Sequence, residues 1–202
     1  MGAGTLHEKI IAGYIGNGVK KLIESCLKDR GLPADLHFAE TRQRFLENYE
    51  AGLIVRTRLY PGIAVAIERL RASGLRLAVL TNKPEKFAVL ILKALRLHPF
   101  FEIIAGEDSL PFKKPHPQSF RTLVRNLDVA PENAVMVGDG PADLRIINPG
   151  SWVPRLFAAW GINSPYKMHR WDPDLICLRP SDLPGRLLET NPLPSGEGRV
   201  RG

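Results

Sequence analysis

The sequence is poor in cysteine and has no long apolar run. Only two cysteines, Cys26 and Cys177, occur among 202 residues, and neither belongs to a CxxC pair. Such sparse cysteine argues against a disulfide framework or a zinc site and fits a reducing compartment. No apolar run approaches the roughly 18 residues of a membrane helix, and the first residues lack the apolar stretch of a signal peptide. We therefore expect a cytoplasmic protein with no membrane partner.

Acidic residues are outnumbered by basic ones, 21 to 28, which gives a formal net charge of +7. Such an excess of positive charge can bind nucleic acid or a small anionic substrate, or it can have no particular partner. The lysines and arginines are scattered, and no recognition-helix or RNA-binding signature accompanies them. We expect no nucleic-acid partner, and a basic nucleic-acid-binding module remains an alternative that rests on charge alone.

Residues 1–58 contain helical patterns and no strand pattern. Apolar side chains recur on one face between Val19 and Leu27, Gly31 with Pro33 ends that helix, and a more polar helix is expected over 36–52. We predict a small helical domain over residues 1–58, of the kind that caps another domain.

From residue 60 onward, short apolar runs alternate with helical patterns. The runs that we predict to be strands are LRLAVL (75–80), EII (102–104), AVMVG (134–138), RLFAAW (155–160) and DLICL (174–178). This alternation predicts an α/β fold over residues 59–188, a Rossmann-like parallel sheet with helices on both faces. The tail at 189–202 is rich in Pro, Gly and charge, and we expect it to be disordered. Ligands of such sheets lie beyond the carboxyl ends of the strands.

Three motifs lie at or near such strand ends. Thr81 and Asn82, in VLTNK, can hold a phosphoryl group at a helix N-terminus, or they can simply cap the helix. A lysine of KKPHP (113–117) can neutralise an anion, or the segment is an exposed loop stiffened by prolines. Asp139 and Asp143, in VGDGPADL, suit a hard cation such as magnesium, or they cap a helix start.

In this order and spacing, the motifs resemble those of the haloacid dehalogenase (HAD) superfamily of phosphatases. YPG (60–62), LTNKP (80–84), KPHP (114–117) and VGDGPADL (137–144) are similar to the phosphoglycolate phosphatase branch. The resemblance implies a substrate site of Thr81, Asn82 and Lys114, with Thr81 and Lys114 as catalytic residues. Thr81, together with Asn82, would hydrogen-bond the phosphoryl oxygens, and Lys114 would neutralise charge. It also implies that Asp139 ligates Mg2+ with Asp143 in support. These roles suit phosphoryl transfer, which depends on positioning and charge stabilisation.

The nucleophile implied by the resemblance is absent. The family carries it in an Asp-x-Asp-x-Thr motif on its first strand, whereas the only Asp-x-Asp here is Asp172-Pro173-Asp174, which precedes a predicted strand and is interpreted as a turn. We therefore expect a truncated chain that is inactive alone. The missing strand belongs between the strands that end in VLT and VGD, and its loss removes roughly ten ladder hydrogen bonds of about 0.5–1.5 kcal/mol each. The chain is expected to be unstable, or rearranged so that these two strands pair directly.

A second departure follows Asp143, where Asn148-Pro149-Gly150 would break the helix that the family has there. The leading interpretation is a Mg2+-dependent phosphate monoester hydrolase, acting on a small phosphate ester such as 2-phosphoglycolate, in incomplete form. The alternatives are a non-catalytic remnant or regulatory protein that binds phosphate or a partner, and another chemistry of the superfamily.

Overall fold

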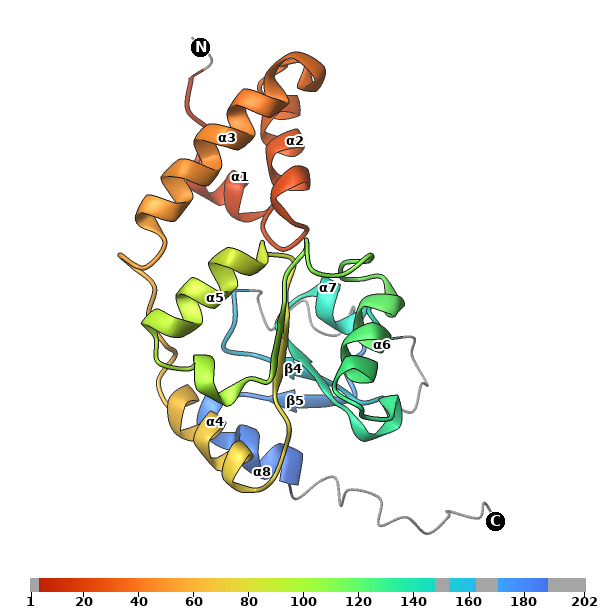
Figure 1. Cartoon of the computed structure of the whole chain (residues 1–202). Helices are drawn as coiled ribbons and strands as arrows, with labels where there is room; N and C mark the ends of the chain where they lie inside the picture. The colour runs from red at the N-terminus through yellow and green to blue at the C-terminus, as the bar shows by residue number, and fades with distance from the viewer. Residues whose placement is uncertain (1–3, 148–152, 163–170, 189–202) are drawn as a thin grey trace.

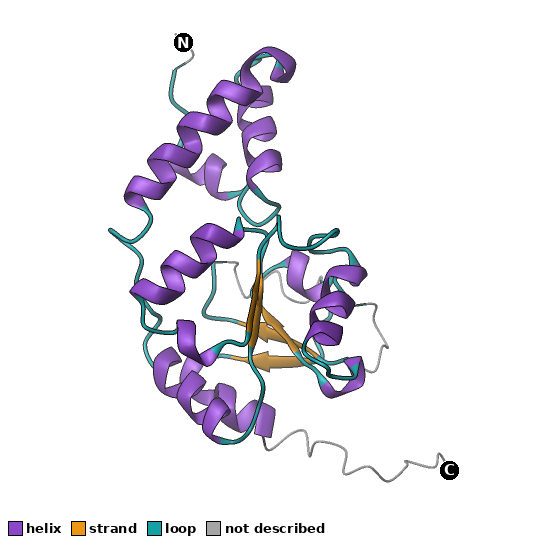
Figure 2. Ribbon diagram, viewed as in Figure 1, coloured by secondary structure: helices purple, strands orange, loops and turns teal. Residues whose placement is uncertain are grey.

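The computed structural model describes residues 4–147, 153–162 and 171–188 (Figure 1). Helices and short strands alternate along the core, as Figure 2 shows by colour. The main elements are α1 (Glu8–Ala12), α2 (Val19–Asp29), α3 (Ala34–Gly52), α4 (Ile63–Ala72), β1 (Ala78–Leu80), α5 (Glu85–Ala94), β2 (Ile103–Ala105), α6 (Pro117–Asn126), β3 (Met136–Gly138), α7 (Pro141–Leu144), β4 (Arg155–Ala158), β5 (Leu175–Cys177) and α8 (Leu183–Leu188). Short 3-10 turns cover His98–Phe100, Pro131–Asn133 and Pro180–Asp182.

The strands form two parallel sheets, of order β1-β2 and β3-β4-β5. All the strand pairs are parallel, with Ala78 opposite Ile103 and Met136 opposite Arg155. Helices α5 and α6 lie on opposite sides of β1 in Figure 2. The predicted α/β fold with a parallel arrangement and flanking helices is therefore confirmed. Of the two expected outcomes, instability or direct pairing of the strands that end in VLT and VGD, the direct pairing is not found, because β1 and β3 belong to different sheets.

The strands differ in burial according to their place in the two sheets. Strand β4, which has a partner on each side, is buried along its whole length. Strands β1 and β3 are also apolar, yet Val79 and Val137 are only half-buried. Within the described residues, β1 and β3 each have one ladder partner, so each presents one unpaired edge.

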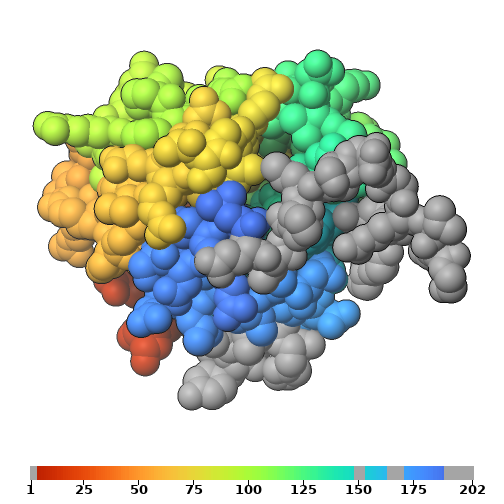
Figure 3. Space-filling model, turned by 90° about the horizontal axis from the view of Figure 1, so that it is seen from below, coloured from red at the N-terminus to blue at the C-terminus, as the bar shows by residue number. Residues whose placement is uncertain are grey.

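Helices α1–α3, here called the cap, extend from one end of the core (Figure 1). The apolar face expected between Val19 and Leu27 packs against Phe38, Phe45 and Leu46 of α3. At the far end, α4 and α8 adjoin in Figure 3, and Leu70 shares a core cluster there with Leu183. The carboxyl ends of β1 and β3 therefore lie on the side of the core that faces the cap. The domain boundary at residue 58 stays a prediction.

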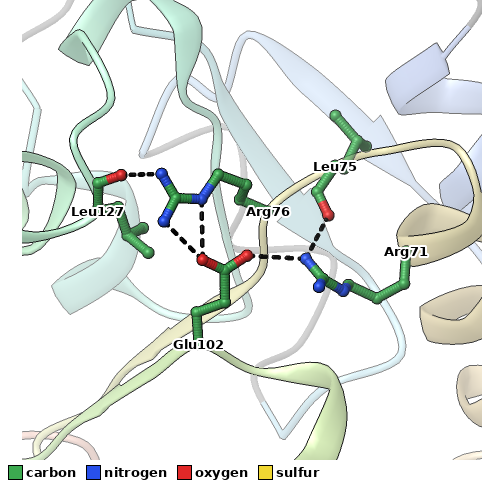
Figure 4. Close-up of polar contacts among 5 residues, drawn as sticks. All are labelled: Arg71, Leu75, Arg76, Glu102 and Leu127. Atoms are coloured by element: carbon green, nitrogen blue, oxygen red, sulfur yellow. Dashed lines mark hydrogen bonds and ion pairs between the residues drawn. The ribbon is translucent and has the colours of Figure 1, made fainter.

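A charged network holds the starts of β1 and β2 together (Figure 4). Glu102 accepts hydrogen bonds from Arg76 at 2.6 Å and from Arg71 at 2.8 Å. Arg71 also donates to the Leu75 carbonyl, and Arg76 to the Leu127 carbonyl. The hydrogen bond from Arg76, helped by the one from Arg71, lowers the pKa of Glu102 below its ordinary value against the opposing effect of burial. This network lies at the end of the strands opposite to the cap.

The Asp-x-Asp at 172–174 belongs to the loop before β5 and serves a structural role. Arg155, 2% exposed, donates from Nε to Asp174 at 2.9 Å and from a terminal nitrogen to the Asp172 carbonyl at 2.6 Å. Burial alone would raise the pKa of Asp174, but the hydrogen bonds from Arg155 outweigh it and lower the pKa.

The strand expected over 75–80 is shorter, because its ladder begins with the Glu102 N–H to Leu77 carbonyl bond and runs over Ala78–Leu80. Asn148-Pro149-Gly150 and the tail at 189–202 lie outside the described residues. In the part of the chain that is described, no helix has the length and apolarity to cross a membrane.

Candidate active site

A chain of hydrogen bonds joins the three motifs at the carboxyl ends of β1 and β3. Asn82, two residues beyond β1, donates from Nδ2 to the Lys114 carbonyl at 2.8 Å. The Lys114 ammonium in turn lies 2.6 Å from Oδ1 of Asp143, on the short helix that follows β3. Asn82 and Lys114 are 32 residues apart in the chain, and Lys114 and Asp143 are 29 residues apart. It is therefore the fold that brings the three motifs together.

Thr81 is held in the turn after β1 by its backbone and by its hydroxyl. Its backbone N–H donates to the Ala105 carbonyl and extends the β1-β2 pairing by one bond. Its Oγ1 accepts the Lys83 N–H at 3.2 Å within the turn before α5, whose N-cap is Pro84 and receives no side-chain cap hydrogen bond. A hydroxyl that accepts one hydrogen bond still has its own proton to donate. Among the described residues no acceptor takes that proton, so the Thr81 hydroxyl can accept the Lys83 N–H and donate to an anion at once.

Asp143 is held from two sides. Its Oδ1 pairs with Lys114, and its Oδ2 accepts the Gly140 N–H at 3.0 Å. The side chain lies so close to β3 that a Cβ on Gly138 would stand 2.2 Å from its Cγ. Both carboxylate oxygens therefore have partners, and Asp143 places the Lys114 ammonium at the end of β3.

Asp139 is oriented by the loop that follows β4. Its Oδ2 accepts the Ile162 N–H at 2.6 Å, and a Cβ on Gly161 would stand 2.1 Å from the Asp139 Cβ. Only a glycine permits this approach. Asp139 is thus a half-buried carboxylate, fixed at one oxygen, directly beyond the end of β3.

The donor set fits magnesium when phosphate and water complete it. Among the described residues no group of three or more His, Cys, Asp or Glu side chains could hold a metal ion. Mg2+ usually takes only one or two protein carboxylates and fills its octahedron with waters and substrate oxygens. Asp139 suits that role, while Asp143 already has Lys114 and Gly140 as partners.

The cap contributes contacts that the sequence interpretation missed. Tyr49 of α3 accepts a hydrogen bond from Lys83 Nζ, and the same ammonium lies 4.6 Å from the centre of its ring. Glu50 pairs with Lys86 at 2.6 Å. Asn82 also donates to the Gly16 carbonyl at 2.9 Å, across 66 residues of chain. The sequence predicts phosphate binding or helix capping for Asn82, and nothing beside it in the chain indicates a contact with the cap.

The sequence matches the haloacid dehalogenase-like hydrolase family over residues 7–148. The match spans most of the chain and includes all five predicted site residues. The chain belongs to this family. As a member, it is by descent a phosphoric monoester hydrolase, since its relatives are phosphatases of that class.

The relatives of this haloacid dehalogenase-like chain include several phosphoglycolate phosphatases. That of Aquifex aeolicus is 35% identical over 173 residues, which cover 86% of this chain and 76% of the relative. That of Cereibacter sphaeroides ATCC 17029 is 42% identical over 134 residues, covering 66% of this chain and 61% of the relative. Among solved structures, a predicted phosphoglycolate phosphatase of Haemophilus somnus superposes with a TM-score of 0.83 at 28% identity, covering 94% of this chain and 85% of that one.

Proposed function

We propose that this chain carries the phosphate- and magnesium-binding part of a phosphate monoesterase site for a small substrate such as 2-phosphoglycolate, in the cytoplasm. One observation carries the proposal: the bonded series Asn82–Lys114–Asp143, which gathers three motifs at the carboxyl ends of β1 and β3. The named relatives supply the substrate class.

Each side chain has a stated task. Thr81 donates its free hydroxyl proton to a phosphoryl oxygen, and the Lys114 ammonium neutralises negative charge on the same group. Asp143 keeps that ammonium in place and leaves Asp139 as the principal ligand of Mg2+, with Asp143 in support. When bound, Mg2+ supplies charge stabilisation and orientation for the phosphate.

Covalent catalysis needs a further carboxylate, because the 202 residues contain no Asp-x-Asp-x-Thr and Asp174 is committed to Arg155. The unpaired edges of β1 and β3 can accept a strand that carries such a carboxylate. Without it, turnover falls by about 10⁴-fold or more, the typical cost of losing a covalent nucleophile.

The experiment is an assay of Mg2+-dependent phosphate release from 2-phosphoglycolate. We compare the chain alone with the chain preceded by a strand segment bearing Asp-x-Asp-x-Thr. We expect turnover only with the segment, and its loss in Asp139→Asn. Asp128→Asn is the matched control, since it makes the same change in the turn after α6, where Asp128 has a φ of 53° that asparagine tolerates well. Normal turnover in Asp139→Asn would contradict the metal assignment.

The second candidate is a non-catalytic protein that binds phosphate or a partner, and the separation of β1 from β3 favours it. Phosphate binding without turnover, even after the segment is added, would select it.

A further inference from the structure

One buried amide bonds the cap and the lysine loop together. The cap turn, Gly16–Asn17–Gly18, leads into α2 and lies against the core. Nδ2 of Asn82 donates to the Gly16 carbonyl at 2.9 Å and to the Lys114 carbonyl at 2.8 Å. The side chain thus bridges the cap turn and the lysine loop, two segments that lie far apart in the chain.

The orientation of this amide depends on both bonds. Carbonyl oxygens only accept, so both must face the NH₂ group of Asn82. Asn82 is 7% exposed, and its Oδ1 has no hydrogen-bond partner in the described part of the chain. If the cap turn moved away, a single bond to Lys114 would be left to hold the buried amide.

The neighbouring lysines reach in different directions from the same loop. Lys113 Nζ donates to the Asn17 carbonyl at 3.2 Å, whereas Lys114 Nζ pairs with Asp143 at 2.6 Å. The cap turn lies so close that a Cβ on Gly18 would stand 2.1 Å from Glu107 Oε2 and 3.0 Å from Lys113 Nζ. The loop is therefore bound to the cap through Lys113 and to α7, the short helix after β3, through Lys114.

We propose that Asn82 is a positioning residue that couples the docking of the cap turn to the placement of the Lys114 ammonium. The importance of that placement rests on the proposed function. Coupling between two sites is reciprocal, so an anion bound at Lys114 tightens the cap turn, and a docked cap turn favours the anion. The docked cap turn thereby helps to place the positive charge of the site.

Hydrogen exchange of the whole chain, without phosphate, tests the coupling. Asn82→Asp keeps the shape of the side chain but has no donor for either carbonyl. We expect exchange in both residues 14–22 and residues 112–119 to quicken about fivefold, the factor given by one lost hydrogen bond of about 1 kcal/mol. Asn133→Asp, the same change at an exposed position, is expected to alter neither segment.

Lys113→Met provides a second variant that leaves Asn82 intact. It frees the Asn17 carbonyl and also removes the ion pair of Lys113 with Glu107, whose atoms lie 3.8 Å apart. We expect it to quicken exchange in residues 14–22 and to leave the pairing of Lys114 unchanged. If Asn82→Asp folds poorly, Lys113→Met tests whether the cap turn is docked on the lysine loop. An unchanged exchange rate in residues 14–22 of Lys113→Met would overturn that docking contact. Quickening confined to residues 81–85 in Asn82→Asp would show a local capping role and overturn the proposal.

Inorganic phosphate with Mg2+ then tests the link to the site. We expect phosphate to slow exchange in residues 14–22 of the wild type and to have no such effect in Asn82→Asp. If the wild type binds no phosphate, the proposed function fails, while the phosphate-free comparison still decides the coupling. Phosphate that binds without slowing residues 14–22 would overturn the coupling and leave the proposed function standing.

Discussion

Replacement of Lys114 by methionine removes one partner of a buried ion pair. Lys114 Nζ and Asp143 Oδ1 are 2.6 Å apart, and each side chain is 11% exposed. Removing one partner of a buried pair costs about 3–5 kcal/mol, because the other charge stays buried and unpaired. Asp143 keeps its bond from the Gly140 N–H, which places the cost near the lower end, about 3 kcal/mol.

The free energy of unfolding, measured by urea titration, checks this magnitude. A loss of about 3 kcal/mol corresponds to a fall in Tm of about 6–12 °C for a chain of this size. The double variant with Asp143→Asn is expected to lose less than the sum of the single variants, with a coupling of about 1–3 kcal/mol.

Lys86→Met is the matched control. Its ion pair with Glu50 has the same 2.6 Å separation, but the two side chains are 63% and 46% exposed. Exposed pairs contribute about 0–1 kcal/mol. If Lys114→Met costs no more than Lys86→Met, then burial does not strengthen the Lys114 pair and the reasoning is refuted.

Three further predictions concern the rest of the core. Because the pKa of Glu102 is lowered on folding, its contribution is complete above the ordinary value of 4.5 and is lost as the pH falls through the folded pKa. Glu102→Gln should therefore lower Tm at pH 7, and the difference should vanish in acid; a difference that persists at pH 2 would contradict this. Arg155→Met should lower the free energy of unfolding, measured by urea titration, by about 2–3 kcal/mol. This is less than for a fully buried pair, because the Asp174 side chain is 42% exposed. A loss under 1 kcal/mol would argue against a structural role for the pair. Gly161→Ala should weaken Mg2+ binding in calorimetry by displacing Asp139, whereas Gly52→Ala, with open space around it, should not; equal binding in both variants would show that the close approach is dispensable.

The helices could be predicted from the sequence because their signals are local. Apolar residues at helical spacing fix α2 and α6, and a buried parallel strand such as β4 is apolar on both faces. The positions of Thr81 and Asp139 directly beyond β1 and β3 also follow from the alternating pattern, because the apolar runs already show where these strands end.

The contacts of Asn82 could not be predicted, because a short polar side chain after a strand has the same sequence signal as a cap or as a ligand. Its partners, Gly16 and Lys114, lie 66 and 32 residues away. Nor does the hydrophobic pattern of the sequence predict that the strands divide into two sheets. Local hydrophobicity shows that β1 and β3 are strands, but their pairing depends on which other strands are available, and their ends meet through Lys114 instead of through a ladder.

Calorimetric titration of the whole chain with inorganic phosphate in the presence of Mg2+ tests the central claim most directly. We predict binding of one phosphate per chain that is lost in Lys114→Met and retained in Lys86→Met. Absence of binding in the wild type, or equal binding in all three proteins, would contradict the assignment of a phosphate site to the ends of β1 and β3.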